Sequence, residues 1–159
     1  MAAQMPAETP GDPALQHVAA LFGGRRILRH RVSTLFDAHE MILHGMPGEA
    51  LMHLVGHLQT LQKAASFEKA VGMSLRTIQR RKEAPAKLLN QEQSGRAWKF
   101  AEILVKATAV LGSQEEAERW LQQPAMGLDQ RRPIDLLATT AGAEIVQDFL
   151  GRLEYGVYT

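Results

Sequence analysis

The sequence predicts an all-α protein, and two observations support this fold class. First, apolar residues recur along the chain at the three- and four-residue spacing of amphipathic helices, and glycine or proline separates the stretches. Second, no stretch alternates apolar and polar residues over the length of a β-strand. The chain has 159 residues, of which 45% are hydrophobic, so it can bury the core of one domain or of two small ones.

The first half of the chain opens with a proline-rich segment, residues 1–13, which we expect to be a flexible leader. An amphipathic stripe then begins at Leu15 and stops at Gly23-Gly24. Two further helical stretches are expected, one from Val32 to Leu43 and one from Pro47 to Leu61.

The second half begins after Pro85, which bars helix continuation and marks a joint. We expect a helical domain over residues 14–93 and a second one over residues 94–159. The helices expected in the second domain are a long one at Ser94–Leu111, one opened by a Ser-x-x-Glu capping box at Ser113–Glu116, a one-turn helix from Pro133, and a last helix near Ala141–Glu154.

A basic stretch at residues 67–82 has the pattern of two short helices joined by a tight turn. Gly72 ends the first helix, and the Ser74 side chain can accept a hydrogen bond from the free N–H groups of the second. Leu75 and Ile78 share one face of that second helix, so its long donor side chains point elsewhere and suit the DNA major groove. The residues predicted to contact DNA are Ser74, Arg76, Thr77, Gln79, Arg80, Arg81 and Lys82. From the spacing alone, a solvated surface helix stays an open alternative.

Charge and cysteine content exclude several classes of protein. The net charge is only +1, but arginines cluster at residues 25–31 and basic residues at 76–87, whereas Glu115, Glu116 and Glu118 form an acidic group. The first basic cluster either contacts DNA phosphates or faces water. Because the chain has no cysteine, it forms no disulfide, thiolate metal site or cysteine nucleophile. With no secretory signal and no membrane-spanning run in the sequence, we expect a cytoplasmic protein that does not bind a membrane.

Signs of catalysis are weak. His53 and His57 are four residues apart and share a helix face, as metal ligands do, but no third ligand or general base accompanies them in a known pattern. The sequence has no phosphate-binding glycine motif and no Gly-x-Ser-x-Gly nucleophile motif. We therefore expect no catalytic residue, no metal and no cofactor, which makes a binding protein the default and a metal hydrolase the minor alternative.

The C-terminal third carries a series of short motifs in order, namely Gly112-Ser113, Glu115-Glu116-Ala117, Trp120-Leu121, Pro124, Pro133 to Leu137, Thr139, Gly142, Val146, Leu150-Gly151-Arg152 and Glu154 to Tyr158. Together these motifs resemble the C-terminal domain of the Xre/MbcA/ParS antitoxins of type II toxin–antitoxin pairs. The stretch upstream, residues 72–82, resembles the Cro-like helix-turn-helix of the same family. The loop Leu128–Pro133 departs from the glycine-richer version of that family, so no role is carried over to Asp129 or Gln130.

The resemblance implies an antitoxin that neutralises a RES-domain toxin, an NAD⁺-consuming enzyme, and that represses its own operon as a homodimer on operator DNA. The catalysis and the NAD⁺ would belong to the toxin. We expect the dimer to form through residues 32–61, together with the long helix from Ser94, because these stretches are rich in apolar residues. An alternative is an interaction module that neutralises its partner without sequence-specific DNA binding.

Tyr155 and Tyr158 follow the last amphipathic helix, where they either pack back on the domain or enter a pocket of a partner. Arginine and aromatic residues dominate the energetics of many interfaces. The residues predicted to contact the toxin are Arg152, Leu153, Glu154, Tyr155, Val157 and Tyr158. Inhibition would be direct, with the tail in the NAD⁺ pocket, or indirect, through an inactive arrangement of the toxin.

Overall fold

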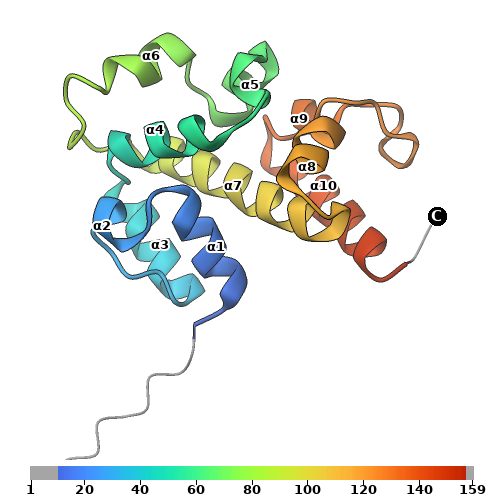
Figure 1. Cartoon of the computed structure of the whole chain (residues 1–159), viewed down its shortest axis with the longest axis horizontal. Coiled ribbons are helices and arrows are strands. Elements are labelled where there is room, and N and C mark those ends of the chain that lie inside the picture. Colours follow the sequence, from blue (N-terminus) through green and yellow to red (C-terminus); the bar gives the residue numbers. More distant parts are fainter. Residues whose placement is uncertain (1–10, 157–159) are drawn as a thin grey trace, which may run out of the picture.

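A 21-residue helix, α7 (Gln91–Leu111), runs through the middle of the molecule, and helices from both halves of the chain pack against it (Figure 1). The computed structural model describes residues 11–156. Within these residues the chain forms helices and two isolated β-bridges but no strand, which confirms the predicted all-α class. Helices from before α7 (α1, α3 and α5) and from after it (α8 and α10) contact it, so α7 joins the two halves of the chain into one core.

The helices before α7 are α1 (Pro13–Leu21), α2 (Gly24–Leu28), α3 (Leu35–His44), α4 (Gly48–His57), the 3₁₀ turn η1 (Leu61–Lys63), α5 (Ala65–Val71) and α6 (Leu75–Arg80). Those after α7 are α8 (Gln114–Leu121), the 3₁₀ turn η2 (Met126–Leu128), α9 (Pro133–Leu136) and α10 (Thr140–Glu154). In residues 11–156, no helix is both long enough and apolar enough to cross a membrane.

Side-chain caps explain where several helices begin. Thr34 and Asp37 form a reciprocal capping box at the start of α3, and Asn90 and Gln93 form one at the start of α7. Of the capping box predicted at Ser113–Glu116, only the first half forms. Ser113 accepts from the Glu116 N–H at 3.1 Å, but the Glu116 carboxylate pairs with Arg119 at 2.8 Å.

Two aromatic pairs pack along α7 within a mostly aliphatic core. Phe22 of the α1 end stacks on Trp98 at 5.8 Å between ring centroids, and Phe67 of α5 meets Phe100 edge-on at 5.1 Å. Trp98 is buried. Trp120 is half-buried and stacks on a side chain of α10.

Several boundaries differ from those expected. Pro13, the last residue of the expected leader, is the first residue of α1, and the Asp12 side chain caps that helix; residues 1–10 lie outside the described part of the chain. The second of the two glycines that end the first stripe, Gly24, is the first residue of α2, a helix that the sequence did not predict. Helix α7 crosses the boundary expected between residues 93 and 94.

A buried carboxylate joins the second half of the chain to the first. Glu118 of α8 is 1% exposed, and its side chain accepts from the consecutive backbone N–H groups of Gln59, Thr60 and Leu61 at 2.9 to 3.1 Å. The Gln114 side-chain amide donates to the same carboxylate at 2.9 Å. These bonds fix the segment between α4 and α5, and thereby the start of the helix-turn-helix, against α8.

Candidate nucleic-acid interface and C-terminal surface

The turn between α5 and α6 satisfies its backbone groups locally. Gly72 has φ +73°, the left-handed conformation that favours glycine at the end of a helix. The Ser74 hydroxyl accepts from the Thr77 N–H at 3.1 Å, as the sequence predicted. The Glu68 carboxylate accepts from the Leu75 N–H at 3.0 Å, so it satisfies a second free donor at the start of α6.

Helix α6 is anchored on one side and exposed on the other. Ile78 is buried and Leu75 is half-buried against the core, and α6 lies over α4 at an outer edge of the molecule (Figure 1). Arg76, Gln79 and Arg80 are exposed. Within residues 11–156, their side chains make no hydrogen bond and no ion pair. Three long donors without protein partners on an outer helix can bind an external acceptor such as a base edge or a phosphate.

The other residues predicted to contact DNA differ in how far they are engaged with the protein itself. The hydroxyls of Ser74 and Thr77 lie 2.9 Å apart, so both belong to the helix cap. The stem of Arg81 is half-buried over the start of α4, where a Cβ added to Gly48 would lie 3.0 to 3.1 Å from three of its carbons. Lys82 is exposed just beyond the helix. The seven predicted residues therefore lie together, but only some of them are turned toward solvent.

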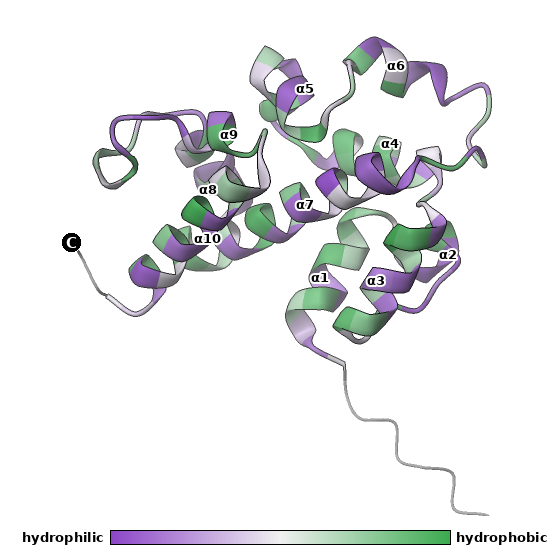
Figure 2. Ribbon diagram, turned by 180° about the vertical axis from the view of Figure 1, so that it is seen from behind, coloured by the Kyte–Doolittle hydropathy of each residue, from purple (hydrophilic) through white to green (hydrophobic). Residues whose placement is uncertain are grey.

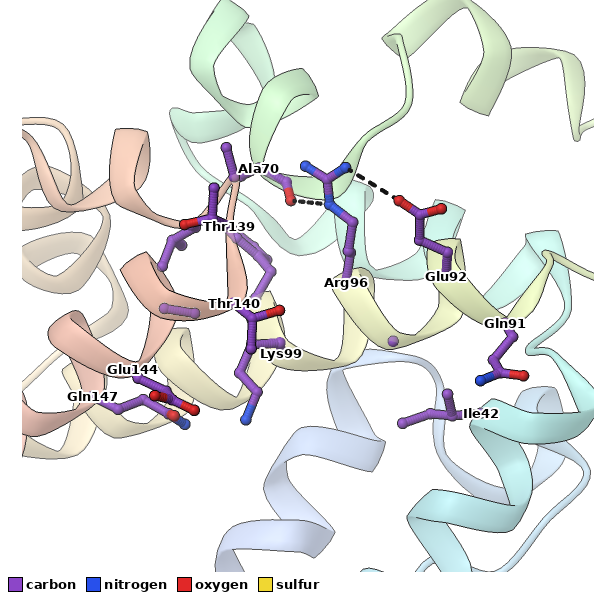
Figure 3. Close-up of a pocket in the computed structure, with 15 residues that line it drawn as sticks. Ile42, Ala70, Gln91, Glu92, Arg96, Lys99, Thr139, Thr140, Glu144 and Gln147 are labelled. Atoms are coloured by element: carbon purple, nitrogen blue, oxygen red, sulfur yellow. Dashed lines mark hydrogen bonds and ion pairs between the residues drawn. The ribbon is translucent and has the colours of Figure 1, made fainter.

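Arg96 of α7 also holds the turn, a contact that the sequence did not predict. Arg96 donates from Nε to the Ala70 carbonyl at 3.2 Å and from Nη2 to the Lys69 carbonyl, and its guanidinium lies against Gly72. Figure 3 shows Arg96 pointing from α7 toward Ala70, beside Glu92, which is 4.0 Å away. These donors satisfy carbonyls at the end of α5. Nothing in the local sequence signals this contact, because the partners are 26 and 27 residues apart.

Arg96 also lines a cleft of about 740 Å³ between α3, α7 and the start of α10 (Figure 3). Lys99 points away from Arg96 in this cleft and pairs with Glu102 at 3.5 Å. Both cations are thus engaged with groups of the protein.

The two histidines of α4, His53 and His57, stack on each other, and His53 contacts the end of α1. The rings of His53 and His57 stack with centroids 4.3 Å apart, and His53 Nδ1 lies 2.9 Å from the Leu21 carbonyl of α1. In the described part of the chain, no group of three or more histidine or acidic side chains could hold a metal ion. The pair therefore links α4 to the end of α1.

The arginines of residues 25–31 surround α2. Arg25, Arg26 and Arg29 are exposed, and Arg31 is hydrogen-bonded through Nε to the Ser33 hydroxyl at 3.1 Å. Arg29 ends α2 in the left-handed conformation, with φ +59°.

Helix α3 carries apolar side chains that the rest of the described chain leaves uncovered. Leu35, Phe36 and Leu43 are exposed, and Phe36 is 83% exposed. Figure 2 shows hydrophobic segments, coloured green, in the ribbon of α3. The other apolar residues of this region, such as Met41, Leu51 and Leu54, are buried within the chain. Of residues 32–61, only α3 therefore offers an apolar face to a partner.

The predicted toxin-contacting residues lie at the end of α10. Arg152 and Glu154 are exposed, Tyr155 is 80% exposed, and Leu153 packs against the core. Arg152 and Tyr155 line a shallow cleft of about 340 Å³ with Lys106 of α7 and Asp148 of α10. Val157 and Tyr158 lie outside the described residues. Tyr155 thus does not pack back on the domain.

Comparisons with known proteins match both parts of the chain. Residues 37–102 match the antitoxin Xre-like helix-turn-helix domain, and residues 106–156 match the antitoxin Xre/MbcA/ParS C-terminal toxin-binding domain. A protein of Yersinia enterocolitica named Antitoxin Xre is 33% identical over 104 residues, which cover 65% of this chain and 70% of that protein. Another protein named Antitoxin Xre, from Photorhabdus laumondii, is 28% identical over 90 residues, or 56% of this chain and 60% of that protein.

Proposed function

Because the chain belongs to the Xre family of antitoxins, we propose that it neutralises an NAD⁺-consuming RES-domain toxin and represses the operon that encodes the pair. The observation that carries the repressor half is the surface of α6, whose exposed donors Arg76, Gln79 and Arg80 have no partner within residues 11–156. The toxin-binding half is supported by the match of residues 106–156 to the toxin-binding domain of the family.

We assign base contacts to α6 because the helix is short and is held at its start and along its inner face. Ser74 and Glu68 fix its start, and Ile78 anchors its inner face. A helix held in this way keeps its free donors at a fixed depth in the major groove, where arginine reads guanine and glutamine reads adenine. Lys82, just beyond the helix, contacts a phosphate in this arrangement.

The homodimer of this proposal uses the exposed face of α3. Leu35, Phe36 and Leu43 would become buried in a two-fold contact, which uses the same surface of both subunits. A dimer presents two copies of α6 to DNA, so its operator is a near-palindrome with half-sites about one helical turn apart.

The toxin is held by the end of α10 and the residues that follow it. Tyr155 and Arg152 are exposed there and belong to the residue types that most often dominate interface energies. The tail either enters the NAD⁺ pocket of the toxin or holds the toxin in an inactive arrangement. The antitoxin itself needs no cofactor or metal in this proposal, carries out no catalysis, and acts in the cytoplasm.

DNA binding is tested by a gel shift with the promoter region of the operon. Replacing Arg76, Arg80 and Arg81 together with alanine should abolish the specific shift, and Arg80→Ala alone should cost about 1–3 kcal/mol if Arg80 pairs with a base. Lys82→Ala should instead weaken binding to all sequences alike and lower the salt slope by about one. Arg119→Ala, a surface arginine of α8, serves as the control. An unchanged shift with the triple variant would refute the assignment of α6.

Toxin binding is tested separately by deleting residues 153–159. Cells that produce the RES-domain toxin should no longer be rescued, while the gel shift persists. Neutralisation that survives the deletion would place the toxin contact elsewhere. A full-length chain that rescues growth but gives only a weak, salt-sensitive shift would favour an interaction module that does not read DNA.

A further inference from the structure

The loop between α8 and α9 exposes an apolar side chain although the loop itself is held in place. Met126 in η2 is 85% exposed. The loop around it is closed by a bridge between Ala125 and Arg131, with the Ala125 N–H donating to the Arg131 carbonyl at 3.1 Å and the Gln130 N–H to the Ala125 carbonyl at 3.0 Å. The methionine is therefore displayed on a fixed support.

The backbone of this loop is strained at two adjacent positions. Asp129 and Gln130 have φ +56° and +59°, in the left-handed region that residues with a side chain rarely adopt. Strain of this kind persists where the surrounding structure enforces it, and it is concentrated at binding and catalytic sites. The chain thus keeps an unfavourable backbone in the loop that carries Met126.

The loop rests on the aromatic residues of the C-terminal helices. Gly127 lies directly on Phe149 of α10, because an added Cβ would be 2.2 Å from its Cε2 atom. Phe149 in turn stacks on Trp120 of α8, with ring planes 6° apart and centroids at 6.0 Å. Ile145 is 51% exposed and lies one helical turn before Phe149. Met126, Ile145 and the half-buried rings of Phe149 and Trp120 form what we name the Met126–Ile145 surface.

We propose that the Met126–Ile145 surface is a second contact with the toxin, an apolar anchor separate from the C-terminal tail. This inference rests on the proposed antitoxin function. The surface lies within residues 106–156, which match the toxin-binding domain, and Arg152 follows Ile145 by two turns on the same flank of α10. The anchor is therefore continuous with the proposed tail contact.

The place of the surface in the molecule fits a toxin better than a second copy of this chain. The loop and the end of α10 project at the end of the molecule opposite to α6 and α3 (Figure 1). A partner bound there leaves the proposed DNA-binding and dimer surfaces free. The matching surface of the toxin is an apolar recess that takes the flexible methionine of the loop and the isoleucine of α10.

The test measures the affinity of the full-length chain for the purified, catalytically inactive RES-domain toxin of its operon by calorimetry. Met126→Glu and Ile145→Glu should each weaken binding at least tenfold, and Met126→Leu should restore affinity to within threefold of the native value. The matched control is Leu88→Glu, because Leu88 is also an exposed apolar residue (52%) but lies before α7, paired with Pro47. The affinity of the Leu88→Glu variant for the toxin should stay within twofold of the native value. Melting temperature and the gel shift confirm that each variant is folded.

The outcomes separate the two proposals. If the native chain does not bind the toxin at all, the proposed function fails. If the native chain binds but both glutamate variants keep its affinity within twofold, the function stands and the anchor is wrong. The anchor is also wrong if these variants change only the self-association of the chain, measured by light scattering, without changing its affinity for the toxin.

Discussion

Glu118 should contribute more to stability than any other acidic side chain of the C-terminal helices. Its carboxylate receives the backbone N–H groups of residues 59–61 and the amide of Gln114. The change Glu118→Ala removes the acceptor for all of these donors at once. The change Glu118→Gln keeps the shape but loses the charge and turns an NH₂ group toward backbone donors.

The expected loss in the free energy of unfolding follows from the hydrogen bond that each N–H donor loses when the carboxylate is removed. A buried donor left without an acceptor costs about 1–3 kcal/mol. Leu61 is buried, so its N–H bears the full cost, whereas Gln59 and Thr60 are surface residues whose N–H groups can partly recover water. We therefore expect Glu118→Ala to lower the free energy of unfolding by about 3–4 kcal/mol and Glu118→Gln by about 2 kcal/mol. The loss is large beside a typical total of about 5–15 kcal/mol.

Urea unfolding followed by circular dichroism measures this difference, provided that the slope of the transition is unchanged. Glu115→Ala is the matched control, because Glu115 is on the same helix, is exposed, and pairs with Arg119 at 3.3 Å only at the surface. Its effect should stay below about 1 kcal/mol. A Glu118→Ala variant that unfolds within about 1 kcal/mol of the native chain would refute the reasoning.

Four further predictions concern single positions. Gly72→Ala should destabilise the chain by about 2 kcal/mol or more in urea unfolding, because the alanine is strained at φ +73° and its Cβ would lie 2.5 Å from Arg96. Gly95→Ala, in the interior of α7 with only a contact at 3.7 Å, should instead stabilise it by about 0.5–1 kcal/mol. Gln130→Gly should raise stability by about 0.5–1 kcal/mol by relieving the left-handed strain, and an unchanged or lower value would mean that the loop is not strained. Asp37 accepts from the Ser33 and Thr34 N–H groups, which lowers its pKa below the ordinary 3.8, so its stabilising effect is present above that pH and is lost as the pH falls through the lowered pKa. Thermal unfolding measured from pH 6, about two pH units above the ordinary pKa of an aspartate, downward should thus show a smaller acid-induced loss for Asp37→Asn than for the native chain.

The fold class and the helix-turn-helix could be predicted because their signals are local. Helical periodicity, a glycine that suits the left-handed conformation, and a serine before a run of apolar residues each act within a few positions of the chain. Gly72 and Ser74 therefore occupy the places that their residue types predict. Helix α2 was missed because Gly23 and Gly24 usually mark a turn, and here the second glycine is the first residue of the helix.

The roles of several charged residues could not be predicted, because their partners are distant in the chain. Glu118 was grouped with Glu115 and Glu116 as part of an acidic stretch, yet its partners are 57 to 59 residues away and it is buried. Arg96 holds the turn of the helix-turn-helix from a helix that begins 19 residues after that turn's Gly72.

The sequence by itself determined where helices form, which turn separates α5 from α6, and which family signature the C-terminal part carries, because these depend on neighbouring residues. Only the tertiary structure decided which apolar side chains are covered. Met41 and Leu54 are buried while Phe36 and Met126 face solvent, although all four are apolar. Burial depends on which helices meet, and contacts between distant segments are absent from a local pattern.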